Sequence, residues 1–234
     1  MELRPLIRRL ARLAPAFAIA LALSGAASPV VAEHEGSPEL GSLLDCDRPV
    51  TPPRCVSVGD DFRHYIVIDA SVPRALADSV RRAMRDAYGP TALRMIEQRR
   101  VNRFTDVIVY AADHGANGAA GWVNCPAEAR QGVNEHGDRW CRHQELHFNL
   151  NARYAAFFAD DDSRTHLACH EIGHSVGLRH WGNPPRTDGP VAATCMHADT
   201  PNGPVSLHRY DRAHINAYYA RPVDRLAKRC MSEL

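Results

Sequence analysis

The chain has 234 residues, of which 45% are hydrophobic, so it contains enough apolar side chain for one sizeable core. Its 28 basic and 27 acidic residues leave a formal net charge of +1. Overall charge therefore gives no reason to expect a nucleic acid or an anionic membrane as a partner.

The N-terminus has the three-part pattern of a secretory signal peptide. Arginines at positions 4, 8, 9 and 12 precede the apolar run LAPAFAIALAL, and small residues follow through SGAASPVVA. We expect residues 1–32 to be removed by cleavage after Ala32, with Ala27 as the alternative, and the product to be secreted. The apolar run is short for a permanent membrane anchor, and no later run of about 20 apolar residues occurs.

Export predicts that the seven cysteines form disulfides more readily than they remain thiols. The sequence does not determine their connectivity. Nearest-neighbour pairing would join Cys46 to Cys55, Cys125 to Cys141 and Cys169 to Cys195, and would leave Cys230 over. No CxxC spacing occurs, so a structural zinc site built from cysteines is not expected.

Residues 33–60 are an irregular lead-in or a short pro-segment, and residues 61–234 are expected to form the main domain. Within it, the pattern predicts strands at 62–70 and 104–113, with an amphipathic helix at 72–89 between them. A glycine-rich loop, 114–122, follows the second strand. Residues 207–219 predict a C-terminal helix that docks on the domain, after a loop-like stretch that is rich in proline and glycine.

Residues 144–151 predict a third strand, because apolar and polar side chains alternate strictly. Leu146 and Phe148 share one face, and His147 and Asn149 share the other, which we expect to be wet. The order of strands and helices argues for a mixed α+β layer structure.

The stretch CHEIGHSVGLRH, residues 169–180, lies on a predicted helix over 159–177. Asp and Ser at its start are N-cap residues, and acidic side chains there suit the positive end of the helix dipole. The acidic run ADDD, residues 159–162, offers carboxylates of the kind that bind calcium, but helix capping explains the same residues, so a structural Ca²⁺ has no further support.

The spacing of this stretch is suited to metal chemistry. His170 and His174 are four residues apart, so on a helix they stand on one face about 6 Å apart along the axis and can bind one zinc ion. Glu171 lies about 100° further round, where it can act on a water molecule as a general base without being a ligand. Gly177 can end the helix in the left-handed conformation and let His180 supply a third ligand. Three protein ligands leave one position open, as in catalytic zinc sites.

The run HEIGHSVGLRH resembles the zinc-binding motif of the metzincin metalloendopeptidases, and its surroundings are similar to those in matrixin-like and small secreted actinobacterial members. The resemblance implies a zincin-like α+β fold: a twisted mixed β-sheet packed on the active-site helix, with a C-terminal helix. It also implies a methionine turn beneath the zinc, for which TCMHAD supplies Met196. Cys169 precedes the first ligand and Cys195 precedes Met196, so a disulfide between them would clamp the helix to this turn.

The resemblance further implies that the strand ahead of the active-site helix, residues 144–151, pairs with the substrate backbone. Some features depart from the family pattern. Trp181 follows the third histidine and matches no familiar subfamily choice, and no tyrosine follows Met196, where His197 is expected to be structural. PPRCVS is only faintly similar to the cysteine switch of matrixin pro-segments, in which Cys55 would cap the zinc, and Cys46 offers Cys55 a nearer disulfide partner.

The sequence therefore predicts a secreted zinc-dependent endopeptidase with one catalytic Zn²⁺ held by His170, His174 and His180, and with Glu171 as general base. Its expected partner is a protein or peptide substrate, with no nucleic acid, no stable membrane anchor and an open oligomeric state. The alternatives are a secreted zinc hydrolase of a non-peptide amide and a catalytically inactive, zinc-stabilised binding or toxin-like module.

Overall fold

The computed structural model describes residues 56–134, 138–180, 194–197 and 201–220. The predicted signal peptide, most of the lead-in, Cys46, Cys55, Trp181 and Cys230 lie outside these residues, so the expectations attached to them stay predictions. None of the described helices combines the length and apolar character needed to cross a bilayer.

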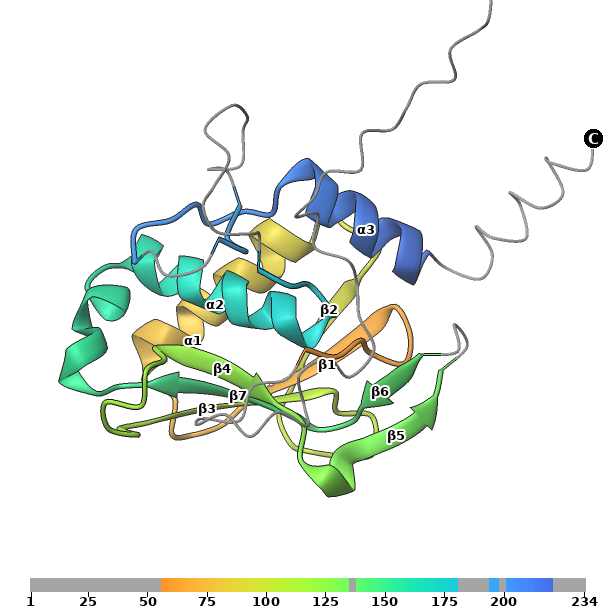
Figure 1. Ribbon diagram of the computed structural model, residues 1–234, viewed down its shortest axis with the longest axis horizontal. Coiled ribbons are helices and arrows are strands. Elements are labelled where there is room, and N and C mark those ends of the chain that lie inside the picture. The colour runs from red at the N-terminus through yellow and green to blue at the C-terminus, as the bar shows by residue number, and fades with distance from the viewer. Residues whose placement is uncertain (1–55, 135–137, 181–193, 198–200, 221–234) are drawn as a thin grey trace, which may run out of the picture. The chain divides into compact units, whose positions relative to one another are not determined.

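A five-stranded sheet forms the centre of the domain, with the order β2-β1-β3-β7-β4 (Figure 1). Four strands are parallel, and β4 runs antiparallel to β7. The strands expected near 62–70, 104–113 and 144–151 are all present. The strands are β1 (Arg63–Ile68), β2 (Arg94–Gln98), β3 (Val107–Ala112), β4 (Gly121–Asn124) and β7 (Gln144–Asn149).

A small two-stranded sheet follows β4. It pairs β5 (Arg130–Val133) with β6 (Arg139–Cys141), after the 3-10 turn η2 (Ala127–Ala129). The disulfide Cys125–Cys141 joins the two ends of this segment, with Cα atoms 6.0 Å apart. This pairing is the one expected from nearest neighbours.

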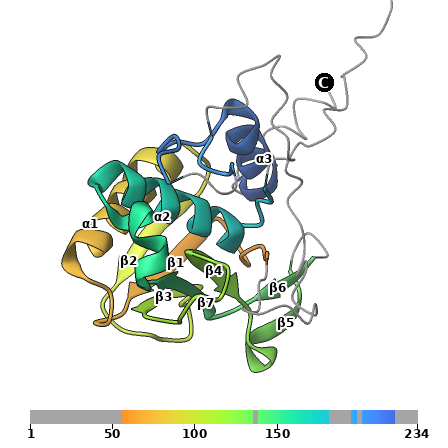
Figure 2. The ribbon, with the colours of Figure 1, turned by 60° about the vertical axis from the view of Figure 1, so that its left-hand side comes forward.

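The helices α1 and α2 cover one face of the main sheet (Figures 1 and 2). Leu146 and Phe148 of the sheet and Ile172 and Val176 of the α2 segment are fully buried between these layers. The expected architecture, a twisted mixed sheet packed on the motif helix with a C-terminal helix, is confirmed. The helices are α1 (Arg74–Ala83), its π-helical continuation η1 (Met84–Tyr88), the 3-10 helix η3 (Ala152–Phe158), α2 (Asp161–Ser175) and α3 (Arg209–Tyr219).

Four strands, β2, β4, β5 and β6, were not expected from the sequence. Each has only three to five residues, and β4 begins at Gly121 inside the stretch that reads as a glycine-rich loop. Such short strands carry little periodicity, and they form because a long-range partner supplies the hydrogen bonds.

Two expectations about the strand at 144–151 are wrong. The strand β7 lies between β3 and β4, so both of its edges are already paired, and β4 ends the sheet instead. The face expected to be wet is largely covered. Asn149 is fully buried, and the His147 ring stacks on Trp122 at 4.9 Å and on Tyr110 at 5.5 Å. Cross-strand partners, which the sequence does not show, bury this face.

The buried Asn149 side chain organises the loop of residues 113–120, which leads from β3 to β4. Its amide nitrogen is 2.9 Å from the Gly115 carbonyl, 3.0 Å from the Asn117 side-chain oxygen and 3.1 Å from the Ala119 carbonyl. Its oxygen accepts a hydrogen bond from the His114 backbone N–H at 3.0 Å. One amide therefore satisfies several polar groups of a loop that has no strand pairing of its own.

Replacing this side chain tests its role in stability. Asn149→Ala should lower the free energy of unfolding by about 3 kcal/mol, because several polar groups of the loop lose their partner. Urea unfolding followed by circular dichroism measures the loss. The matched control is Asn124→Ala, which removes one long hydrogen bond of 3.4 Å to Glu145 and should cost little. Equal losses in the two variants would show that Asn149 has no special role.

Candidate metal centre

The helix that carries the motif begins at a capped terminus. Asp160 is the N-cap residue, and its side chain accepts a hydrogen bond of 2.8 Å from the Ser163 backbone N–H. Asp161 and Asp162 add negative charge to the first turn, where the helix dipole is positive. The sequence predicted both features, because they depend only on neighbouring residues.

The same helix ends in a Schellman turn that reverses the chain. Gly177 has φ 96°, a left-handed conformation that suits glycine, as expected. The N–H of Leu178 donates to the Gly173 carbonyl at 2.8 Å, and the N–H of Gly177 donates to the His174 carbonyl at 3.2 Å. This pair of bonds turns the chain back so that His180 reaches the face that carries the other two histidines.

Three imidazole nitrogens converge at this place. The Nε2 atoms of His170 and His180 are 2.9 Å apart, those of His170 and His174 are 3.1 Å apart, and those of His174 and His180 are 3.0 Å apart. In the described part of the chain, these residues form the one group of three or more His, Cys, Asp or Glu side chains with metal-ligand spacing. The structure thus brings together the three histidines that the sequence singled out.

Backbone carbonyls determine which nitrogen of two of these rings carries the proton. The Nδ1 atom of His170 is 2.8 Å from the Cys195 carbonyl, and the Nδ1 atom of His174 is 2.8 Å from the Leu178 carbonyl. A carbonyl oxygen only accepts, so each Nδ1 must be the donor. In the neutral rings, both Nε2 atoms then present lone pairs to the same point.

Burial reinforces this neutral state. It lowers the pKa of His170 well below its ordinary value, and the nearby rings of His174 and His180 lower it further. His170 and His174 are each 8% exposed, whereas His180 is exposed. The cluster is therefore anchored on a buried helix and opens to solvent beside its third member.

This arrangement fits a tetrahedral divalent metal ion. Two lone pairs about 3 Å apart repel each other unless a cation lies between them, and neutral imidazole is a good ligand for such ions. Bonds of about 2.0–2.1 Å in a tetrahedron place the ligand nitrogens about 3.3 Å apart, close to the observed spacing. Three histidines would hold the ion and leave a fourth position for another ligand.

Glu171 is 3% exposed and lies against the start of β4. A Cβ atom added to Gly121 would come within 2.7 Å of Glu171 Oε1 and within 2.9 Å of its Cδ and Cγ atoms. Only a glycine leaves room for the carboxylate at this place. The edge strand of the sheet and the acidic residue of the motif are thus in direct contact.

Met196 is fully buried and packs on the motif helix at Gly173, where an added Cβ would collide with the methionine sulfur. The disulfide Cys169–Cys195 links the residues just before His170 and Met196, with Cα atoms 5.9 Å apart. The disulfide is the pairing that the resemblance implies. The methionine segment, residues 194–197, thus lies directly against the helix and supplies the carbonyl that orients His170.

The C-terminal helix supports this segment from the other side. Its N-cap residue is His208, and Asp211 completes a capping box. The buried Asp211 carboxylate also accepts a hydrogen bond of 2.5 Å from the Thr194 hydroxyl, which in turn accepts one of 3.1 Å from the Met196 backbone N–H. The capping group of α3 therefore helps to hold the methionine segment.

A third histidine of this helix, His166, lies near the cluster but does not belong to it. His166 stands four residues before His170, at the same spacing as the ligand pair, and its ring centroid is 6.4 Å from that of His170. Its Nδ1 is 2.7 Å from the Pro204 carbonyl, and it is not a member of the three-histidine cluster. The i, i+4 spacing is visible in the sequence, but the hydrogen-bond contact of His166 with the distant Pro204 carbonyl is not.

A second polar layer lies beneath the last turn of α2. His64 is fully buried, with its Nε2 3.1 Å from Ser175 Oγ and its Nδ1 3.9 Å from the Asp106 carboxylate. Burial lowers the pKa of His64 from 6.5 to about 4, and burial raises the pKa of the Asp106 carboxyl. Gln144 donates to the Ser175 carbonyl at 2.9 Å. This layer supports the turn that carries His174.

Comparisons with known proteins add little to this geometry. No protein-family model matches the sequence, and no curated protein sequence matches it. Among solved structures, the chain is similar to high choriolytic enzyme 1, a hatching enzyme zinc-protease from the medaka fish Oryzias latipes. The identity is 16% and the TM-score is 0.37, and the similarity covers 67% of this chain and 88% of that one. At this TM-score the likeness supports no assignment.

The buried His64 predicts a pH dependence of stability. In the unfolded chain its pKa is near 6.5, and in the folded protein it is about 4, so between these values the unfolded chain binds more protons. The fold should therefore lose about 3 kcal/mol of His64-dependent stability as the pH falls through this window. Urea unfolding of the parent and of His64→Gln across the window measures this contribution as a difference, which cancels the other histidines. Parallel losses in both proteins would contradict the assignment.

Proposed function

We propose that the protein is a secreted zinc-dependent endopeptidase. The observation that carries the proposal is the pair of hydrogen bonds from His170 and His174 to backbone carbonyls. They aim two Nε2 lone pairs at one point, and the Nε2 atom of His180 lies within 3.0 Å of both. Three neutral histidines with an open position suit a catalytic zinc ion better than a structural one. The two disulfides support export, since they persist in oxidising compartments.

The reaction would be hydrolysis of a peptide bond by water. A bound zinc ion would supply Lewis-acid polarisation of the scissile carbonyl and would lower the pKa of a water molecule. Glu171, held against Gly121, would take a proton from the attacking water and deliver it to the leaving amine. The cluster opens to solvent beside the exposed His180, and the substrate and the water would enter there.

The edge strand β4 would bind the substrate. It ends the sheet, and in the described residues no strand pairs with its outer edge. An extended peptide that adds to this edge would have its backbone next to Gly121 and hence next to Glu171. Main-chain pairing of this kind favours a polypeptide over a small amide substrate.

The direct test removes the general base and keeps the ligands. Glu171→Gln should reduce proteolysis of an unfolded protein substrate by about 1,000-fold, because the proton transfer is lost, while zinc remains bound. Activity is measured beside the parent protein and a chelator-treated sample, and zinc content is measured by atomic emission. Full activity of the zinc-loaded variant would refute the mechanism. A parent protein that binds zinc but cleaves nothing would favour the inactive binding module, and cleavage restricted to small amides would favour the non-peptide hydrolase.

A second variant tests the contact between the edge strand and the base. Gly121→Ala should displace the Glu171 carboxylate and lower kcat/KM by about 100-fold, since a displacement of about 1 Å has that effect on a catalytic group. Zinc content should not change. Gly132→Ala in β5 is the matched control, because an added Cβ there has no neighbour within 4 Å. Equal activities of the two variants would mean that Glu171 does not need its present position.

A further inference from the structure

Residues 99–104 form the first part of the loop that joins β2 to β3, and all six of their side chains are exposed. They read RRVNRF, and two of them are apolar: Val101 is 47% exposed and Phe104 is 55% exposed. In the described part of the chain only one other large apolar side chain, Leu150, is exposed. Exposed apolar side chains are therefore concentrated here, next to three arginines.

The backbone of this loop is held in place by hydrogen bonds at its centre. The Asn102 carbonyl accepts from Thr105 N–H at 3.0 Å and lies 2.9 Å from His143 Nε2, while the Asn102 side chain accepts from Phe104 N–H at 2.8 Å. The Thr105 hydroxyl donates to the Gln98 side chain at 3.0 Å. These hydrogen bonds hold the loop backbone in one conformation, so less conformational entropy is lost when its side chains bind a partner.

The positive charge of the loop is not neutralised locally. Arg99, Arg100 and Arg103 form no ion pair with any carboxylate of the described residues, although Arg103 lies over the Phe104 ring at 4.6 Å. The acidic residues that flank the loop are engaged elsewhere. Glu97 pairs with Arg81 at 2.7 Å, and the buried Asp106 accepts a hydrogen bond of 2.7 Å from Tyr65 N–H.

We propose that residues 99–104 are a docking site for an anionic lipid surface. The three guanidinium groups bind lipid phosphates or carboxylates, and Val101 and Phe104 enter the interface between headgroups and acyl chains. This inference does not depend on the proposed function.

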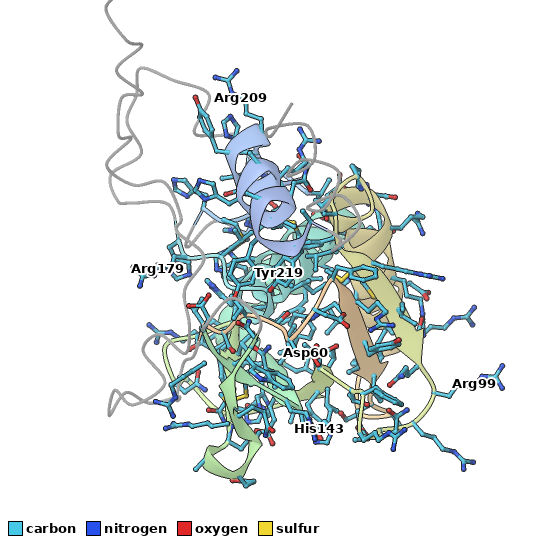
Figure 3. The ribbon with its side chains drawn as sticks, turned by 90° about the vertical axis from the view of Figure 1, so that its right-hand side faces the viewer. Asp60, Arg99, His143, Arg179, Arg209 and Tyr219 are labelled. Carbon is cyan, nitrogen blue, oxygen red and sulfur yellow. A yellow bond between two sulfur atoms is a disulfide. The ribbon has the colours of Figure 1, made fainter. Side chains whose placement is uncertain are left out.

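Position and composition both favour this partner. Figure 3 shows Arg99 on the opposite side of the domain from Arg179, the neighbour of the third histidine, so a docked protein keeps its metal centre open to solvent. A soluble polyanion would engage the arginines but would leave the two apolar side chains in water. A lipid interface accommodates both kinds of side chain.

Vesicle binding tests the proposal. The purified protein is sedimented with phosphatidylcholine vesicles that contain or lack phosphatidylserine, over a range of salt concentrations. We expect binding only with phosphatidylserine, and we expect salt to weaken it. The triple substitution Arg99→Gln, Arg100→Gln and Arg103→Gln should weaken partitioning by about 100-fold, at about fivefold for each charge.

Two further variants identify what the loop recognises. The matched control, Arg74→Gln, Arg153→Gln and Arg212→Gln, removes three exposed arginines from other elements and should partition nearly as the parent does. If it loses as much binding as the loop variant, net charge alone is responsible and the proposal is wrong. The double variant Val101→Ser, Phe104→Ser should weaken vesicle binding but leave retention on immobilised heparin unchanged. If vesicle binding is unchanged in this variant, the loop is a polyanion site and not a lipid site. Urea unfolding verifies that each variant is folded.

Discussion

The candidate site depends on one constraint: two imidazole rings are held by backbone carbonyls that belong to other turns of the chain. The carbonyl of Cys195 orients His170, and the carbonyl of Leu178 orients His174. The first comes from the methionine segment and the second from the Schellman turn after α2. Both turns are therefore needed to direct the two lone pairs at one position. The disulfide formed by Cys195 and the left-handed Gly177 are the local features that hold these two turns in place.

The site requires α2 to bury polar side chains that need hydrogen-bond partners. Polar side chains on the inner turns of α2 are buried together with its apolar ones, and each needs a partner to offset the loss of water. Different elements supply these partners: the methionine segment serves His170, the reversed chain serves His174, and β1 serves Ser175 through His64. The opposite face, at Ile172, packs in the apolar core. The helix is thus fixed by hydrogen bonds on one side and by packing on the other.

The net charge of the chain differs from the local charge of residues 99–104. The net charge of +1 correctly describes a chain without an excess of one sign. The three arginines of α1 nevertheless all pair with nearby carboxylates, whereas those of residues 99–104 do not. Pairing in one place leaves positive charge uncompensated in another, so a nearly neutral protein still carries a local cationic surface.

The sequence by itself determined the parts of this protein that depend on neighbouring residues. The spacing of His170 and His174, the cap at the start of α2 and the glycine at its end follow from helix geometry, which acts over a few residues. The tertiary structure alone decided which strand forms the edge of the sheet, that Asn149 is buried, and that Gly121 lies against Glu171. These features arise from contacts between distant segments, and the alternation of side chains along one strand cannot show what will cover either face.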